Sequence, residues 1–273
     1  MPSKKIRRLI FTVLHLQFIA YLSKQFGRFK RGVFIKNRVC KNFGLCKNQP
    51  LLNTDVSPLW SFTLQPTNLL LYVDAQFASP YAMTAFVALH EKSLSFEIVT
   101  IDLAANAHHE APFAAASLTQ RVPALVHNGF ALSESSAISE YLDEVFPGVP
   151  LYPAEPHSRA IARQVQAWLR SDLMPVRQER STEVVFYGPT NSALSVEARK
   201  AVEKLFFAAE SLLSSNSENL FGQWCIADVD LALMLNRLVM NGDPVPERLA
   251  VYARRQWQRP SVQLWVNQRR PAR

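Results

Sequence analysis

Residues 121–138 read RVPALVHNGFALSESSAI, and this stretch predicts a β-hairpin that leads directly into a helix. Two short apolar segments, residues 124–127 and 130–133, lie on either side of Asn128-Gly129. This dipeptide favours the two-residue turn of a hairpin, because both of its residues accept a positive φ. Ile138 then opens an apolar repeat at helical spacing, so we expect the chain to pass from the second strand straight into a helix.

The residues before the hairpin predict two more strands and another helix. Residues 69–73 form an apolar run of strand length, and residues 96–102 are rich in β-branched side chains. Between them, Ser79-Pro80 supplies a preferred N-cap and a preferred first helical residue. Residues 103–121 have weak helical character. The order β-α-β-(α)-β-β-α predicts a thioredoxin-like α/β domain over residues 67–147.

The residues after the hairpin predict a second domain built only of helices. Residues 147–158 hold four prolines in twelve positions, which is typical of a linker, and we assign residues 148–157 to it. Apolar residues then repeat at helical spacing, and no segment has the pattern of a strand. Residues 158–273 are therefore expected to form an all-helical domain.

The net charge of +8 belongs to the first quarter of the chain. The protein has 30 Lys and Arg and 22 Asp and Glu, and residues 1–66 hold 12 of the basic residues but only one acidic residue. The remaining 207 residues thus carry 18 basic and 21 acidic side chains. This slightly acidic balance argues against nucleic-acid binding by the two predicted domains.

Residues 1–66 form a basic extension with no persistent apolar period. The apolar run within it spans residues 9–22 and contains His15 and Gln17, so it is too short and too polar for a membrane span. No cleavage site of a signal peptide follows it. We expect the extension to be disordered or the product of a misplaced start. A membrane-surface helix within residues 1–31 and a folded N-terminal domain are the alternatives.

The three cysteines, Cys40, Cys46 and Cys225, do not suggest a disulfide framework. Their odd number and spacing suit a reducing compartment, which favours a cytoplasmic location. No histidine lies near Cys40 and Cys46 at zinc-ligand spacing, and His108-His109 is more typical of a polar surface. The sequence therefore predicts no metal site.

Four local motifs resemble those of the cytosolic glutathione transferases over residues 67–273. They are Ser79-Pro80 after the first strand, RVPAL at residues 121–125, LSESSAI at residues 132–138 and LYP at residues 151–153. Their order and spacing match the family, and finer features look most like the bacterial YfcF-type glutathione transferases. The resemblance implies a thioredoxin-like domain followed by an all-helical one.

The resemblance implies that Ser79 activates the glutathione thiol. A hydroxyl at the positive end of a helix can stabilise a thiolate by a hydrogen bond, and no Ser-His-Asp arrangement that would make Ser79 itself a nucleophile is apparent. Thiol-transferring members of the family carry cysteine at this position. Serine therefore favours conjugation or glutathione-dependent peroxide reduction over disulfide exchange. The structural alternative is that Ser79 only caps its helix.

The same resemblance implies contacts to the rest of glutathione. Val122, held extended by Pro123, offers its backbone N–H and C=O to the cysteinyl portion, and the family carries a cis-proline at the position of Pro123. Glu134 is expected to bind the γ-glutamyl ammonium group, and Ser135 the neighbouring carboxylate. Taken singly, Glu134 and Ser135 are also ordinary residues of a helix start.

Other polar residues are candidates for the two ends of the site. Arg121 can reach the glycyl carboxylate, for which the weaker candidates are His108, His109 and Gln120. The electrophile pocket is expected between Ser79 and the first long helix of the helical domain. Its candidates are the polar-tipped or charged residues Tyr81, Trp168, Arg170, Arg177 and Tyr187, although Trp168 also fits the apolar face of its helix.

One departure from the family lies in the helical domain. The N-capping box there normally begins with Ser or Thr, but this chain has Cys225, with Asp228 three residues on. A thiol is a poor acceptor, so we expect a weakened cap, with Cys225 as a buried structural residue.

The function implied by these residues is that of a homodimeric glutathione transferase. Glutathione is its co-substrate, and its partner is a small hydrophobic electrophile or a peroxide. The alternative is a protein of the same fold that binds a partner in a stress response and catalyses nothing. Glu134 and Ser135 argue against it, because such a protein has no physical need to keep a glutathione site.

Overall fold

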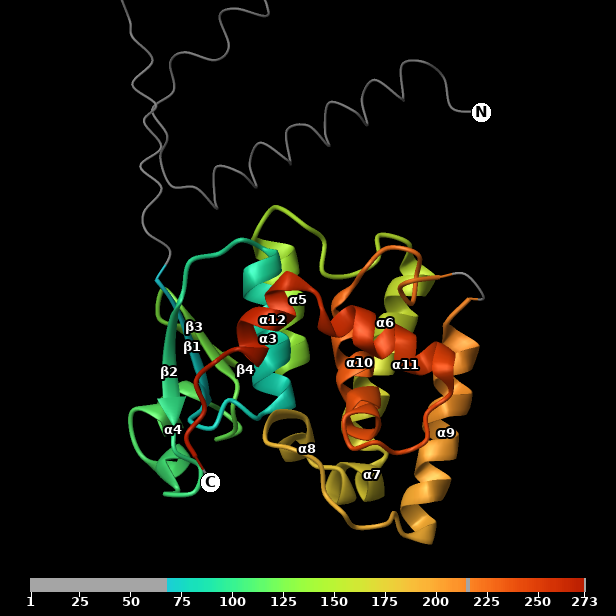
Figure 1. The fold of residues 1–273 in the computed structure, drawn as a ribbon. Coiled ribbons are helices and arrows are strands. Elements are labelled where there is room, and N and C mark those ends of the chain that lie inside the picture. Colours follow the sequence, from blue (N-terminus) through green and yellow to red (C-terminus); the bar gives the residue numbers. More distant parts are fainter. Residues whose placement is uncertain (1–67, 215–216, 273) are drawn as a thin grey trace, which may run out of the picture. The chain divides into compact units, whose positions relative to one another are not determined.

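The computed structural model describes residues 68–214 and 217–272, which belong to one compact unit (Figure 1). The expectations for residues 1–66, and for Cys40 and Cys46, lie outside the described residues. Among the described helices, none has the length and apolar character needed to cross a membrane.

A mixed four-stranded sheet forms the first half of the unit. Its strands are β1 (Leu69–Asp74), β2 (Glu97–Ile101), β3 (Ala124–His127) and β4 (Phe130–Ser133), in the order β2-β1-β3-β4. β1 pairs with β2 in parallel and with β3 antiparallel, and β3 pairs with β4 antiparallel. Asn128 and Gly129 have φ of 50° and 87°, as a tight hairpin turn requires. The predicted hairpin is confirmed.

The alternation of side chains along β1 builds a core on each face of the sheet. Leu69, Leu71 and Val73 belong to the large core that α3 (Pro80–Glu91) and α5 (Ser135–Val145) complete. Tyr72 belongs to the smaller core, where its ring lies 5.3 Å from that of Phe113. Phe113 begins α4 (Phe113–Ala116), which follows the short turn η1 (Ala107–His109). Helices therefore cover both faces, as in a thioredoxin-like domain.

The second half of the described unit is helical. α10 (Ile226–Val239) lies at its centre, with twelve of its fourteen residues buried, and it packs against α6 (Pro156–Ser171), α11 (Glu247–Trp257) and α3. α12 returns to pack on α3, so the last helix lies beside the first half of the unit (Figure 1). The predicted fold class is thus confirmed. The helices are α6 (Pro156–Ser171), α7 (Met174–Glu179), α8 (Thr182–Phe186), α9 (Val196–Leu212), α10 (Ile226–Val239), α11 (Glu247–Trp257) and α12 (Pro260–Val266).

Candidate active site

The loop between β1 and α3 holds Ser79 at the N-terminus of α3. The Ser79 hydroxyl oxygen accepts a hydrogen bond from the backbone N–H of Ala82, at 3.2 Å, and Pro80 is the first residue of the helix. The N-cap interpretation is therefore correct. A hydroxyl has one proton to donate besides its acceptor lone pairs, so capping leaves the O–H of Ser79 available for another partner.

Asp74, the last residue of β1, holds this loop in place. Its carboxylate accepts hydrogen bonds from the N–H of Ala78, at 2.7 Å, and of Ser79, at 3.1 Å. Burial raises the pKa of Asp74, against these two hydrogen bonds, which favour the charged form. Arg270 from the C-terminal tail donates to the Phe77 carbonyl in the same loop, at 3.0 Å. Asp74 of β1 and Arg270 of the C-terminal tail thus both hold the loop that carries Ser79.

The peptide bond between Val122 and Pro123 is cis and immediately precedes β3. The β1–β3 register ends at the Tyr72–Ala124 pair, so Val122 lies just beyond the paired part of the sheet. Val122 is 9% exposed. The backbone at this point is therefore placed where an extended peptide can continue the sheet.

The N-terminus of α5 is open and strained. Glu134 stands at the N-cap with φ of 73° and ψ of 115°, a conformation that costs about 1–3 kcal/mol for a residue other than glycine. Its side chain makes no capping hydrogen bond. Ser135 is the first helical residue and is buried. The first N–H groups of α5 are therefore free of a side-chain cap, which suits them to an anion.

Arg170 of α6 connects Ser135 to the helical half. Its Nη2 donates to the Ser135 hydroxyl, at 2.9 Å, and lies 3.2 Å from the Asp230 carboxylate. Asp230 also accepts from Thr84 of α3, at 2.5 Å, and from Gln166 of α6, at 2.8 Å. This polar network joins helices from both halves of the unit next to the open end of α5.

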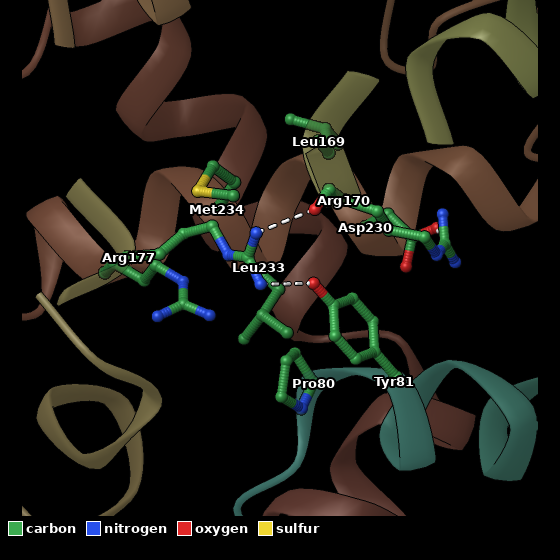
Figure 2. A pocket seen from close by; sticks show the side chains of 9 residues that line it. Pro80, Tyr81, Leu169, Arg170, Arg177, Asp230, Leu233 and Met234 are labelled. Carbon is green, nitrogen blue, oxygen red and sulfur yellow. Dashed lines mark hydrogen bonds and ion pairs between the residues drawn. The ribbon is translucent and has the colours of Figure 1, made fainter. Parts of the chain in front are cut away.

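Arg177 of α7 makes a second connection, through Tyr81 of α3. Its Nη2 donates to the Tyr81 hydroxyl, at 2.8 Å, and its Nη1 to the backbone carbonyl of Arg170, at 2.7 Å. Figure 2 shows both hydrogen bonds, with Leu233 and Met234 of α10 beside them. The guanidinium groups of Arg170 and Arg177 lie over the Tyr81 ring, 5.5 and 5.9 Å from its centroid. Tyr81 is thus held by two cations.

Besides a narrow space of about 20 Å³ lined by Tyr81, Asp230 and Arg237 among others (Figure 2), two wider cavities open along these residues. The smaller, about 190 Å³, is lined by Val122, Pro123, Glu134 and Ser135, together with Tyr81 and three arginines. The larger, about 420 Å³, contains Ser79. Tyr81, Arg121, Val122 and Arg177 line both cavities. The larger cavity also takes in Pro80, Leu103, His108, Gln120, Met174, Ser181, Thr182 and Arg237.

The remaining candidates from the sequence divide into two groups. His108 and Gln120 line the larger cavity, and His109 Nδ1 lies 2.8 Å from the Gln120 side-chain oxygen. Trp168 and Tyr187 line neither cavity. The Trp168 indole donates to Asp172, at 2.9 Å, and the Tyr187 hydroxyl lies 3.5 Å from the Gln76 carbonyl.

The sequence patterns did not identify three residues of this region, which are Asp74, Asp230 and Arg237. Asp74 follows an apolar strand and could have been suspected from that position. Asp230 and Arg237 lie in α10, whose polar residues carry no periodic signal because the helix is buried on nearly all sides. The described residues contain no cluster of three His, Cys, Asp or Glu side chains able to hold a metal ion.

Comparison with known proteins gives matches over both halves of the unit. Residues 78–145 match the N-terminal domain of glutathione S-transferases, and residues 155–269 match the C-terminal domain. Maleylacetoacetate isomerase from Rattus norvegicus is 30% identical over 154 residues, which cover 56% of this chain and 68% of that protein. Glutathione S-transferase Z1 from Arabidopsis thaliana is 28% identical over 177 residues, 61% of this chain and 78% of that protein.

A solved structure matches over a larger share of its own length. It is a glutathione transferase homologue from Burkholderia gl BGR1 with bound glutathione, and it is 50% identical to this chain. The match covers 73% of this chain and 96% of that one, with a TM-score of 0.61.

Proposed function

This chain belongs to the glutathione S-transferase family, and we propose that it binds glutathione in the smaller cavity and presents the thiolate to an electrophile in the larger one. The observation that carries the proposal is the placement of three segments along one pair of cavities. Ser79, Val122-Pro123 and Glu134-Ser135 are far apart in the sequence yet line spaces that share Tyr81 and Val122. The glutathione bound by the 50%-identical Burkholderia homologue supports the same ligand here.

Ser79 is the residue we propose to activate the thiol. The hydroxyl oxygen accepts the capping hydrogen bond from Ala82, and the O–H is free to donate to sulfur. The N-terminus of α3 adds partial positive charge at the same point. Both effects stabilise the thiolate, which then forms a C–S bond at the electrophilic carbon, and the leaving group departs with the electron pair of its bond to that carbon.

The other contacts follow from charge and position. The γ-glutamyl carboxylate would take the open N-terminus of α5 and the Ser135 hydroxyl, and Glu134 would take the ammonium group. The backbone of Val122, beyond the end of the β1–β3 pairing, would hold the cysteinyl portion as an added strand. Arg121, which lines both cavities, is the candidate for the glycyl carboxylate.

Several finer assignments belong to this proposal. Conjugation or peroxide reduction rather than disulfide exchange, the YfcF-type subgroup and a homodimer rest on the resemblance. A cytoplasmic location rests on the cysteines, and the domain boundaries at residues 67–147 and 158–273 rest on the proline-rich linker and the apolar patterns on either side of it. The presence of serine at position 79 supports the first of these.

A catalytically inactive binding protein is the competing function, and glutathione binding separates the two. The folded protein is titrated with glutathione by calorimetry, and conjugation is followed with 1-chloro-2,4-dinitrobenzene. We expect saturable binding and turnover. Failure of the folded protein to bind glutathione would leave only the competing function.

The role of Ser79 is tested with Ser79→Ala and Ser79→Asp. Aspartate caps a helix about as well as serine, but it has no proton to donate at neutral pH and its charge repels a thiolate. We expect Ser79→Asp to keep the wild-type stability and both variants to lose roughly 10²-fold in kcat, since an aimed donor is removed. An unchanged kcat in Ser79→Ala would mean that Ser79 only caps α3 and does not activate the thiol.

A further inference from the structure

Arg237 of α10 is a buried cation without an acidic partner. Arg237 is 5% exposed, and among the described residues no carboxylate lies within ion-pair distance of its guanidinium group. Its Nε has no hydrogen-bond partner, and Nη1 donates to the backbone carbonyl of Arg180, at 2.8 Å. Burying an unpaired charge is costly, so this side chain calls for an anion that completes its environment.

Arg237 lines the larger cavity, and all the Arg, Lys, Asp and Glu side chains that line this cavity are positively charged. Arg121, Arg177 and Arg237 line it together with Ser79, and no Asp or Glu is among its lining residues. Asp230, which lines a narrow space of about 20 Å³ together with Arg237, is paired with Arg170 at 3.2 Å. A positively charged, partly enclosed cleft concentrates anions.

Glutathione as proposed above does not account for Arg237. The smaller cavity has its own cations, Arg121, Arg170 and Arg177, but Arg237 is not among its lining residues. The two donors of Arg177 that are hydrogen-bonded serve Tyr81 and Arg170. Arg237 therefore lines the cavity that holds Ser79 and lies apart from Glu134 and Ser135, which line only the smaller cavity.

Arg237 keeps its charge in spite of burial. Burial, together with the charge of Arg177, lowers the pKa of Arg237 to about 10, and Tyr81 opposes part of this shift. The group is thus still a cation at neutral pH. Its position in the last turn of α10 gives partial compensation from the helix dipole, but this leaves the Nε–H unpaired.

We propose that Arg237 binds a carboxylate on the electrophile, so that the second substrate is an anionic electrophile rather than a purely apolar one. Nη1 of Arg237 donates to the Arg180 carbonyl and its Nε is enclosed, so the guanidinium would hold a carboxylate by its charge and by a charge-assisted hydrogen bond from Nη2. The cavity of about 420 Å³ is within the size range of sites for small molecules. The inference rests on the proposed function, since it assigns the substrate class of the same site.

The probe is 4-chloro-3,5-dinitrobenzoate, compared with its neutral methyl ester. In both, the glutathione thiolate forms a C–S bond at the carbon bearing chlorine, and chloride leaves with the electron pair of the C–Cl bond. The two compounds differ in the charge that Arg237 would recognise. The quantity measured is the ratio of kcat/KM for the acid to kcat/KM for the ester.

We expect Arg237→Met to lower this ratio by about 10- to 100-fold, the effect of losing a charge-assisted hydrogen bond. Arg237→Lys, which keeps the charge without the guanidinium, should recover part of the preference. Arg254→Met is the matched control, because it removes an exposed arginine of α11 and should leave the ratio unchanged. An equal loss for acid and ester would overturn the proposal and make Arg237 a general contributor to thiolate formation or folding.

A binding measurement keeps the proposal testable if Arg237→Met does not fold. The wild-type protein is titrated with unreactive 3,5-dinitrobenzoate and with its methyl ester, and we expect the acid to bind at least about tenfold more tightly. Equal affinities would overturn the anionic subsite even if glutathione conjugation proceeds. Tight binding of the acid without any glutathione binding would instead support the subsite and refute the proposed function.

Discussion

The backbone N–H of Ser79 donates a hydrogen bond to the carboxylate of Asp74, at 3.1 Å, while the other oxygen of Asp74 accepts from Ala78. One buried side chain thus satisfies two N–H groups of the loop that carries the proposed thiol-activating hydroxyl. Both oxygens are needed as acceptors, so replacing the carboxylate by an amide tests the role of Asp74.

Asp74→Asn should destabilise the protein and slow conjugation. An amide has a single acceptor oxygen, so one loop N–H would face an NH₂ group, at a cost of roughly 1–3 kcal/mol. Urea unfolding and kcat with 1-chloro-2,4-dinitrobenzene measure the two effects. Asp102→Asn is the matched control, because one Asp102 oxygen accepts from both Ala104 and Ala105 in an exposed loop and asparagine can replace it. Equal stability of the two variants would mean that Asp74 does not hold the loop.

Arg170→Met should weaken glutathione binding. Arg170 donates to the Ser135 hydroxyl and so leaves the Ser135 O–H free to point toward a ligand. Without it, we expect the glutathione dissociation constant to rise roughly tenfold, the value of about one charge-assisted hydrogen bond. Calorimetric titration measures this change.

The stability of Arg170→Met needs its own control, since Asp230 would lose a cation and the loss of a buried partner costs about 3–5 kcal/mol. Adding Asp230→Asn should restore most of the stability without restoring the affinity. If affinity returned with stability, Arg170 would act through the fold and not through Ser135.

Local signals were sufficient to predict the sheet. Asn128-Gly129 fixed the hairpin, because a two-residue turn sets the register of both strands. Ser79-Pro80 identified the start of α3, because the N-cap is determined by residues within a few positions of one another. The positive φ of Glu134 had no such signal, since glutamate does not favour this conformation and the surrounding fold imposes it.

The cavities depend on contacts that no local pattern contains. Arg170 and Arg177, which the sequence offered as candidates for the same pocket as Tyr81, lie over its ring, whereas Trp168, on the same helix as Arg170, donates to Asp172. α6 and α3 both pack on α10, and this packing decides which face of α6 lies toward α3. Because α10 is buried on nearly all sides, its sequence does not show which of its faces contacts which helix. The partners of Asp230 and the isolation of Arg237 therefore emerge only when three helices are assembled.

Glu91 gives the protein a pH-dependent contact between α3 and α12. Burial alone would raise the pKa of Glu91, but hydrogen bonds from Arg259 and Ser261, with the charge of Arg259, hold it below the usual value of 4.5. A carboxyl whose pKa is lowered on folding stabilises the protein above its unfolded pKa, and this contribution is lost as the pH falls through the folded pKa.

Glu91→Gln should therefore cost roughly 1–3 kcal/mol at pH 7, and the difference from wild type should shrink as the pH falls below about 4.5. Urea unfolding over this pH range measures it. Glu247→Gln removes an exposed partner of Arg254 and should have little effect at any pH. A difference that stays constant with pH would show that the charge of Glu91 is not what stabilises the contact.

Cys225→Ser should stabilise the protein by about 0.5–1 kcal/mol, because a hydroxyl is a better N-cap acceptor than a thiol. Both halves of the capping box are formed, since the Cys225 thiol accepts from the Asp228 N–H and the Asp228 carboxylate accepts from the Cys225 N–H, at 2.9 Å. Asp228 also accepts from the Leu220 N–H and the Tyr252 hydroxyl, each at 2.8 Å, so the acidic partner stays fixed in the variant.

The opposing effect is the burial of a hydroxyl at a site where Cys225 is 1% exposed, which costs about 1–3 kcal/mol when the group lacks a partner. Here the new hydroxyl can accept from the N–H of Asp228 and donate to its carboxylate, so we expect the cap to outweigh the burial. Cys225→Ala, which has neither an acceptor nor a donor, should be less stable than both. A serine variant less stable than wild type in urea unfolding would mean that the thiol is retained for its packing.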